Sequence, residues 1–374
     1  MEDSHLSVDE LALWLSGRME HEQMLKTVAA HLLARCPSCR ESVQEIRRLQ
    51  EEAGHWDEVV AVSESREAPD LFARLDGLSY PEQVRCVEED EDLHSWGFCR
   101  FLLTRSRDLV LDDPTRAVDL ANLAVRVSFH LDDSYDPYWV LDLRAKSYAY
   151  LGNARRVLGE LRSAEDAFLK AEECLAKSMT GIPRVEAEIL HLKASHRRAQ
   201  RQLDDALVLA DRALALYREA GDRQGIVATL LKKSKILEEL GEFDRAIDLL
   251  SQAPAEIEVD LHPRLLQVAR HNLLTCLASA GRFEEAEALL PEVRALAERL
   301  AQPLDLVRLR WTEGRVALGR GRAAEAEVAF REVQQEFLDR RMGYDAALVS
   351  LDLAVLYAQE GKRRELKRLA VDVM

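Results

Sequence analysis

The segment Gly241-Glu-Phe243-Asp-Arg-Ala246 recurs along the chain at an almost constant interval. Each copy begins with Gly or a polar residue, has an apolar residue two positions later and ends in Ala. The final alanines of the five clearest copies recur at an interval of about 40 residues. The other copies are Gly159–Ala164, Arg201–Ala206, Gly281–Ala286 and Gly321–Ala326, with a degenerate copy at Gly361–Leu366 and a leading copy expected within Trp96–Arg126.

This interval fits pairs of antiparallel helices joined by tight turns. Gly tolerates the left-handed backbone of such a turn, and small residues such as Ala164 and Ala171 let a neighbouring helix approach closely. Asp113-Pro114 is a helix start signal, because a capping carboxylate precedes Pro at the first helical position. One pair cannot bury its apolar stripe alone, so successive pairs must stack. We therefore predict an all-α fold in which residues 93–374 form an α-solenoid of about six or seven helix pairs. The fixed period disfavours unrelated helices packed in one globule.

The composition limits the class of protein. The 374 residues carry a formal net charge of −16, and aromatic residues make up only 6% of them. This acidic balance argues against nucleic acid as a partner, because a nucleic-acid binder needs clustered cations. The chain has no apolar stretch of about 20 residues that could span a membrane, and its first residues do not form a signal segment. Six cysteines are too few for a disulfide framework, so we expect a cytoplasmic protein without a membrane partner.

The repeats resemble the tetratricopeptide repeat family. The residues that carry this resemblance are Leu151, Gly152, Gly159, Leu161, Ala164, Phe168 and Ala171. The resemblance covers about three quarters of the chain, from roughly residue 90 onward, but its step is longer than that of the family, which is about 34 residues. The longer step implies longer helices or longer loops between repeats. The resemblance implies a right-handed superhelix whose concave face binds peptides or partner proteins, and it implies no catalytic activity.

Transferring the family's inward-facing positions defines a candidate groove. Its residues are Lys146, Asn153, Arg156, His191, Ser195, Arg198, Lys235, His271, Thr275, Trp311 and Arg315. Several of these are cationic on a chain that is acidic overall, which favours an acidic or carboxylate-bearing peptide as the ligand. The alternative is a solvated face with ordinary charges.

The stretch 1–52 forms a different predicted module. Ser7-Val-Asp-Glu10 is a capping box that starts a short helix, and a second helical stretch leads to Cys36-Pro-Ser-Cys39. Two thiolates in such a turn can reach one ion, and structural zinc needs four ligands. His31 lies just upstream, and an antiparallel turn could bring His5 alongside it. The pattern therefore favours one zinc ion bound by His5, His31, Cys36 and Cys39. A metal-free helical module and a redox pair remain as alternatives.

This module resembles the zinc-binding anti-sigma-factor domain of bacteria. The resemblance rests on three segments in order: Leu13–Met19, Val28–Leu32 and Cys36–Arg40. Here four residues separate His31 from Cys36 where the family usually has three, which adds about 100° of helical rotation. Cys36 must therefore lie beyond the helix end for the ion to be held. The resemblance implies that the module binds an extracytoplasmic-function sigma factor and blocks its polymerase-binding surface.

Two classes of function follow. In the first, the protein is a bacterial regulator that binds a sigma factor through residues 1–52 and a second protein or peptide through the groove. In the second, it is a general adaptor whose zinc module is only structural, and oxidation of Cys36 and Cys39 with zinc release is a third possibility. We expect residues 53–92 to form a connector with short helices. The chain has no phosphate-binding glycine loop, Gly-x-Ser-x-Gly or His-Glu-x-x-His motif, so we expect no enzyme activity.

Overall fold

The computed structural model describes residues 57–131, 135–178, 180–257, 263–300 and 303–372. These residues form α-helices and short 3-10 helices, and they include no strand. The predicted all-α class is therefore confirmed for this part of the chain. None of its helices is long and apolar enough to cross a membrane. The helices fall into two compact units, of which one ends at Asp222 and the other begins at Arg223.

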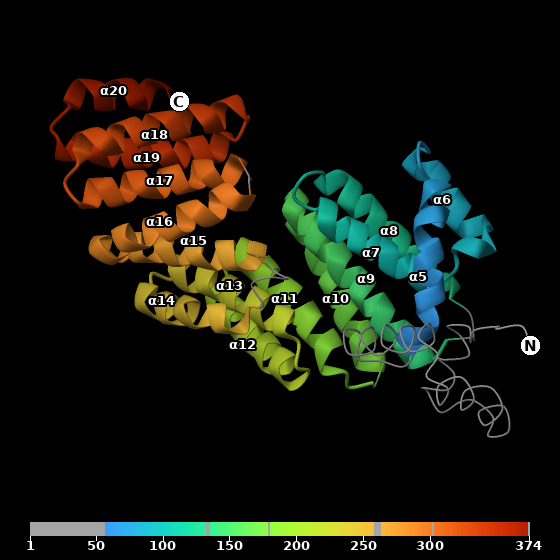
Figure 1. The fold of residues 1–374 in the computed structure, drawn as a ribbon. Helices are drawn as coiled ribbons and strands as arrows, with labels where there is room; N and C mark the ends of the chain where they lie inside the picture. The colour runs from blue at the N-terminus through green and yellow to red at the C-terminus, as the bar shows by residue number, and fades with distance from the viewer. Residues whose placement is uncertain (1–56, 132–134, 179, 258–262, 301–302, 373–374) are drawn as a thin grey trace, which may run out of the picture. The chain divides into compact units, whose positions relative to one another are not determined.

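The first unit begins with two helices that precede the repeats and continues with three helix pairs. Its helices are α5 (Asp57–Ala73), α6 (Tyr80–Glu89), α7 (Trp96–Leu109), α8 (Pro114–His130), α9 (Pro137–Leu158), α10 (Leu161–Ser178), α11 (Pro183–Ala199) and α12 (Leu203–Glu219). The 3-10 turn η2 (Glu91–Leu93) precedes α7. Each pair packs a first helix on a second one, and the first helices α7, α9 and α11 contact one another in turn (Figure 1).

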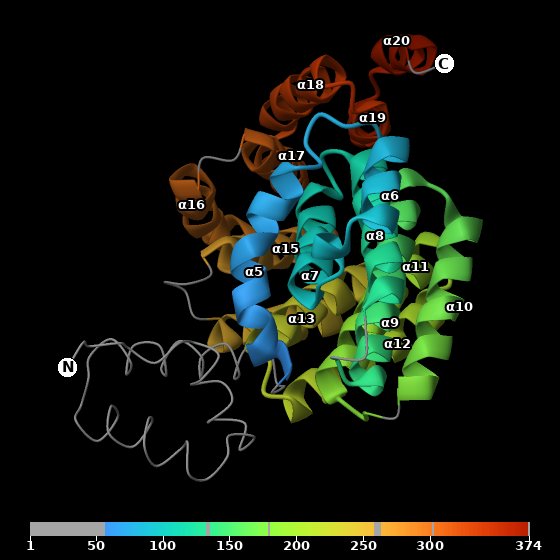
Figure 2. The same ribbon diagram turned by 90° about the vertical axis from the view of Figure 1, so that its right-hand side faces the viewer.

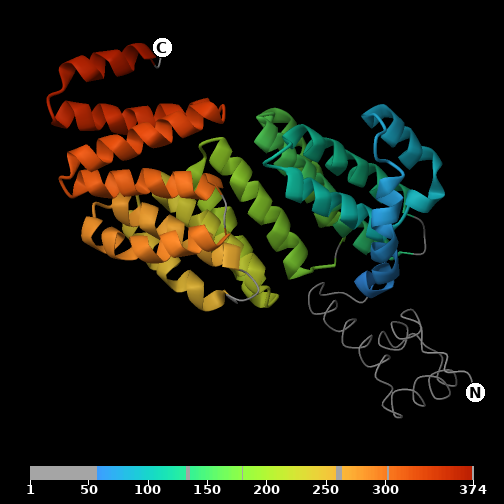
Figure 3. The same ribbon diagram turned by 45° about the horizontal axis from the view of Figure 1, so that its top comes forward.

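The second unit contains four more pairs. Its helices are α13 (Arg223–Glu239), α14 (Phe243–Gln252), α15 (Pro263–Ser279), α16 (Phe283–Leu300), α17 (Pro303–Gly319), α18 (Ala323–Asp339), α19 (Gly343–Gln359) and α20 (Arg363–Asp372), with the 3-10 turn η3 (Ala253–Glu256) after α14. The pair α17–α18 stacks on α19, which α20 then covers (Figure 3). The described residues thus hold seven pairs, which agrees with the predicted number.

Longer helices explain why the repeat interval exceeds that of the family. From α11 onward most helices have 17 residues, and short turns join them. The turn residue that opens each copy of the repeat has a left-handed backbone, with φ of +89° at Gly159 and +73° at Gly281. Arg201 occupies the same turn position with φ of +64°, where a Cβ atom costs conformational energy. The predicted start at Asp113-Pro114 is confirmed, because α8 begins at Pro114 and the Asp113 carboxylate accepts from the Arg116 amide at 3.0 Å.

Two glycines let the paired helices touch. A Cβ atom at Gly152 would lie 2.9 Å from the ring of Phe168, and one at Gly314 would lie 2.6 Å from the ring of Phe330. Both rings are fully buried. Ala164 and Ala171 are also fully buried, as expected for positions that face a neighbouring helix. The repeat pattern therefore marks the contact surface between the two helices of a pair.

A carboxylate joins α5 to the first repeat, and α5 and α7 lie side by side (Figure 2). Glu64 accepts hydrogen bonds from the Gly97 amide at 2.9 Å and from the Tyr135 hydroxyl at 2.6 Å. A Cβ atom at Gly97 would lie 2.5 Å from the backbone of Glu64, so this approach requires glycine. The described part of the expected connector, residues 53–92, holds α5, α6 and the start of η2.

Candidate functional site

The first helices α7, α9 and α11 enclose a pocket of about 140 Å³ in the first unit. Its lining residues are Arg100, Leu103, Thr104, Arg107, Leu143, Lys146, Tyr150, Ile182, Arg184, Val185 and Glu188. Four of them are cationic and one is a carboxylate. The helical spacing explains why these side chains share one face, since Arg100 and Arg107 are two turns apart on α7.

The carboxylate of the pocket is Glu188, and it is half-buried between two donors. Lys146 Nζ lies 3.1 Å from it, and the Tyr150 hydroxyl donates a hydrogen bond to it. Burial alone would raise the pKa of Glu188, but the charge of Lys146 and these two hydrogen bonds outweigh it and lower the pKa. Burial and the nearby Glu188 raise the pKa of Tyr150 well above its ordinary value. The pocket therefore holds an ionised carboxylate and a protonated phenol near neutral pH.

Two arginines of the pocket also contact carboxylates at its rim. Arg184 Nε lies 2.9 Å from a carboxylate oxygen of Asp222. Arg107 Nε lies 3.4 Å from a carboxylate oxygen of Asp108, and both of these side chains are about half exposed. The Arg107 pair contributes little, because water competes for both partners. The lining as a whole has more cationic side chains than carboxylates, so the pocket favours a ligand that carries an anionic group.

A second group of cations lies at the other end of α9. Arg156 donates from Nε at 3.2 Å and from Nη2 at 2.9 Å to the side-chain oxygen of Asn153, which is buried. Burial, together with the nearby charge of Arg198, lowers the pKa of Arg156 to about 10. On α11, the His191 ring packs edge-on against Tyr217 with ring centres 6.4 Å apart. Ser195 follows one turn later and is half-buried.

The structure thus places six predicted groove residues on neighbouring helices of the first unit. Lys146, Asn153 and Arg156 lie on α9, and His191, Ser195 and Arg198 lie on α11. The sequence interpretation missed Arg100 and Arg107 because α7 lacks the repeat signature, and it missed Arg184 because this residue lies in the first turn of α11. The signal for the first two was their spacing of seven positions in an amphipathic segment.

The other predicted groove residues lie in the second unit, where His271 is near Lys235. Lys235 donates to Glu238 at 2.8 Å, and the Thr275 hydroxyl donates to the backbone carbonyl of His271 at 3.0 Å. Burial, followed by the charge of Lys235, lowers the pKa of His271 to about 4. His271 is therefore neutral at physiological pH.

Trp311 and Arg315 share one partner. The Trp311 indole donates to Asp352 at 2.6 Å, and Arg315 Nε donates to the same carboxylate oxygen at 2.8 Å. The Arg315 guanidinium also lies 4.8 Å from the centre of the Trp311 ring. These contacts join α17 to α19, so both side chains help to pack the second unit.

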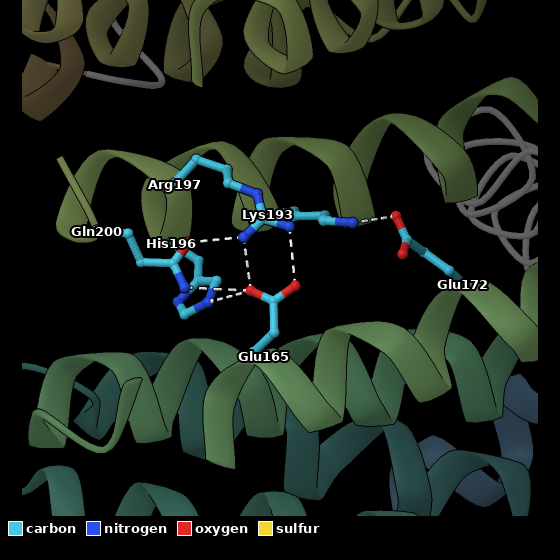
Figure 4. Close-up of polar contacts among 6 residues, drawn as sticks. All are labelled: Glu165, Glu172, Lys193, His196, Arg197 and Gln200. Carbon is cyan, nitrogen blue, oxygen red and sulfur yellow. Dashed lines mark hydrogen bonds and ion pairs between the residues drawn. The ribbon is translucent and has the colours of Figure 1, made fainter. Parts of the chain in front are cut away.

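A partly buried polar network joins α10 to α11 (Figure 4). Glu165 accepts from His196 at 2.8 Å, from both terminal nitrogens of Arg197 at 2.6 and 2.8 Å, and from Gln200 at 3.2 Å. Burial would raise the pKa of Glu165, but Arg197 and His196 outweigh it and lower the pKa to about 2. Burial also lowers the pKa of His196, which is fully buried. These groups bond to one another across two helices, which is typical of a structural contact.

The predicted zinc ligands His5, His31, Cys36 and Cys39 lie outside the described residues. Within the described ranges, no three His, Cys, Asp or Glu side chains gather so that they could hold a metal ion. Cys99 and Cys276 are buried, and burial raises the pKa of each thiol to about 12. These two cysteines therefore behave as small apolar groups.

Comparisons with known proteins support the repeat assignment. A family model described as a tetratricopeptide repeat matches residues 185–253. No curated protein sequence matches the chain. The crystal structure of aspartyl phosphate phosphatase F from Bacillus subtilis is similar with a TM-score of 0.60 at 13% identity, covering 100% of this chain and 95% of that chain.

Two further solved structures share the fold. The apo form of RapI gives a TM-score of 0.56 at 14% identity and covers 74% of this chain and 97% of that chain. A signal transduction ATPase with a tetratricopeptide repeat sensor, from Pyrococcus horikoshii, gives a TM-score of 0.51 at 15% identity and covers 90% of this chain and 54% of that chain. At these identities the likeness establishes the fold alone. The predicted solenoid of helix pairs is confirmed, and residues 185–253 match the tetratricopeptide repeat model.

Proposed function

We propose that this protein is a helical-repeat interaction scaffold that binds an anionic segment of a partner protein. The segment would contact the face that α7, α9 and α11 form in the first unit. The observation that carries this proposal is the pocket, whose lining contains Arg100, Arg107, Lys146 and Arg184 and one carboxylate, Glu188.

The charge distribution supports an anionic ligand. The chain as a whole has a net charge of −16, so a cationic pocket stands out against an acidic background and attracts the anionic part of a partner. Arginine is suited to this role because its planar guanidinium can donate two parallel hydrogen bonds to a carboxylate. Partial burial of Arg100 and Arg184 reduces competition from water.

Binding of synthetic peptides tests the proposal. A short glutamate-containing peptide and its glutamine counterpart are titrated into the full chain by calorimetry at several salt concentrations. The glutamate peptide should bind more tightly, and salt should weaken its binding. Arg100→Gln should weaken it about tenfold, because a charge-assisted hydrogen bond contributes roughly 1.4 kcal/mol or more. Arg107→Gln should weaken it less, because that side chain is about half exposed and water competes for it.

The matched control is Arg162→Gln, which removes an exposed arginine from the second helix α10. This variant should bind the glutamate peptide as the unaltered chain does. Equal affinity for the glutamate and glutamine peptides would refute the proposal. So would a loss of affinity in Arg162→Gln as large as that in Arg107→Gln.

A second candidate function rests on the sequence of the N-terminal module. We propose that His5, His31, Cys36 and Cys39 bind one zinc ion and that this module holds a sigma factor, with the array recruiting a second protein. The support is the order and spacing of these four residues and the resemblance to anti-sigma-factor domains.

Two measurements separate the candidates. Metal analysis of the purified chain should find one zinc ion, and the double variant Cys36→Ser, Cys39→Ser should lose it. Co-purification should recover a sigma factor at near-stoichiometric level. Absence of a sigma factor, together with unchanged peptide binding after deletion of residues 1–50, would leave the general adaptor as the function.

A further inference from the structure

The first helix of the last described pair, α19, exposes large apolar side chains on one side. Tyr344 is 77% exposed, Leu351 62% and Val355 50%. Their helical spacing places them, together with the half-buried Leu348, on the same side of α19. These four residues form the outer face. Within the described ranges α19 packs on α17, α18 and α20, and those three helices leave the outer face open.

The preceding pair shows what meets these positions when another pair follows. The first helices α17 and α19 begin 40 residues apart, so Leu351 and Val355 occupy the positions of Trp311 and Arg315. Both of those side chains donate to Asp352 on the next first helix, at 2.6 and 2.8 Å. These two positions therefore face the helix that stacks next.

The pair before that one gives the same result for Tyr344. This residue occupies the position of Arg264 on α15, and Arg264 donates to Asp305 on α17 at 3.2 Å. The outer face is therefore the surface on which a further first helix would stack. On α15 and α17 polar groups make this contact, whereas α19 offers apolar side chains whose burial would favour docking.

Charged residues on the second helices distinguish this end from the earlier pairs. Glu287 on α16 pairs with Arg322, in the turn of the next pair, at 2.5 Å. Glu327 on α18 accepts from Lys362, in the turn of the pair after it, at 2.8 Å. The position that follows Glu327 by 40 residues is Lys367 on α20, which is exposed. The residue that meets a following pair has thus changed from a carboxylate to a cation.

This change of sign decides which occupant fits. Arg364 is also exposed, one turn before Lys367. A further repeat of this kind would bring a basic turn residue, as Arg322 and Lys362 are, and the cations would repel. A second copy placed face to face would bring the cations of two α20 helices together, which is unfavourable for the same reason. A partner helix with carboxylates in that place gains both apolar burial and charge complementarity.

We propose that the outer face binds an amphipathic helix of a partner protein, and that this helix carries carboxylates in its last turn. Its apolar stripe packs on Leu351 and the other residues of the outer face. Its carboxylates lie near Lys367, because the corresponding residue Glu327 contacts the C-terminal end of α19 by accepting from Tyr357 at 3.0 Å. This docking surface belongs to the second unit, and the pocket of the first unit takes no part in it.

Labelled helical peptides test the proposal by fluorescence anisotropy with the full chain. The peptides have about 18 residues and a leucine stripe, and side-chain cross-links hold them helical because such short helices are marginal in water. One has two glutamates in its last turn, one has lysines there, and one has the glutamates in its first turn. The peptide with glutamates in its last turn should bind roughly tenfold more tightly than either of the others, and salt should reduce this difference.

Variants of exposed residues assign the contacts. Leu351→Gln should weaken the binding of all three peptides, because it removes the centre of the apolar face. Lys367→Glu should reverse the preference, so that the lysine peptide binds more tightly. Arg368→Glu is the matched control, because its counterpart on α18, Val328, stays 52% exposed although another pair follows. This variant should keep the preference for glutamates in the last turn, and circular dichroism checks that each variant folds.

The outcomes separate this inference from the function proposed for the first unit. Absence of peptide binding, or binding that Leu351→Gln leaves unchanged, would overturn the inference and leave the anionic-segment scaffold in place. Equal affinity for the peptides with glutamates and with lysines in the last turn would also overturn it. Sedimentation of the chain alone tests the remaining occupant, since a dimer that Leu351→Gln separates would make a second copy the ligand and refute the proposal.

Discussion

The packing of Gly314 against Phe330 leads to a quantitative prediction about stability. In Gly314→Ala the new Cβ atom would lie 2.6 Å and 2.8 Å from two ring carbons of Phe330 and 3.2 Å from the Cβ atom of Ala329. The Phe330 ring is fully buried and belongs to the core cluster of α17, α18 and α19, so it cannot turn away. Forcing an extra methyl group into a filled core costs about 1–3 kcal/mol.

Gly343→Ala provides the matched control in the same unit. Gly343 is the first residue of α19, and nothing lies within 4 Å of a Cβ atom built there. Both variants gain up to about 1 kcal/mol from the helix preference of alanine over glycine. The gain is smaller at a helix end. Gly314→Ala should therefore be less stable than Gly343→Ala by roughly 0.5–2.5 kcal/mol, which is the overpacking cost less the larger helix gain at the interior position.

Urea unfolding of the full chain, followed by circular dichroism and tryptophan fluorescence, measures this difference. Trp311 reports on the second unit, because it packs against Phe337 and no other tryptophan follows Asp222 in the sequence. Equal stability of Gly314→Ala and Gly343→Ala would refute this reasoning, because it would mean that the Phe330 ring moves aside for the new Cβ atom at little cost.

Three further changes have defined outcomes. The pKa of His271 falls from 6.5 to about 4 on folding, so the unfolded chain binds a proton first as the pH drops. The stability that His271 contributes is complete above pH 6.5 and declines between pH 6.5 and about 4. Urea unfolding at several pH values in this range should therefore show that the free energy of unfolding changes less with pH in His271→Gln than in the unaltered chain. Glu165→Gln should lower the stability by about 1–3 kcal/mol, more than Glu172→Gln, because Glu165 has three side-chain partners and Glu172 is more exposed. The Glu165 contribution is present above pH 4.5 and is lost as the pH falls toward 2, which acid titration of the variant would check. Arg201→Gly should raise the melting temperature, because glycine adopts a φ of +64° without the cost of about 1 kcal/mol that a side chain adds.

The helix pairs were predictable because their signals are local. A turn glycine such as Gly281 and a start signal such as Asp113-Pro114 act through backbone atoms only a few positions away. The contact alanines repeat because each pair has the same internal geometry. These features follow from short-range conformational preferences, so the repeat period alone indicated the fold class and the number of pairs.

The candidate site was predictable only in part. The resemblance to the tetratricopeptide repeat family placed Lys146 and Arg156 on an inward face, but it treated all eleven groove positions alike. In the structure Trp311 and Arg315 bond to Asp352, so they pack helices together. No spacing rule predicts that contact, because Asp352 lies on a separate helix in the next pair.

The sequence by itself determined that this protein is a chain of helix pairs, since the turns and contact positions are encoded within each repeat. The tertiary structure decided which charges meet. It placed Glu188 opposite Lys146 and Asp352 opposite Arg315, and it brought Arg107 from α7 to the pocket that holds Glu188. The sign of an electrostatic contact depends on which side chains face each other across separate helices, and only the stacking of those helices sets that alignment.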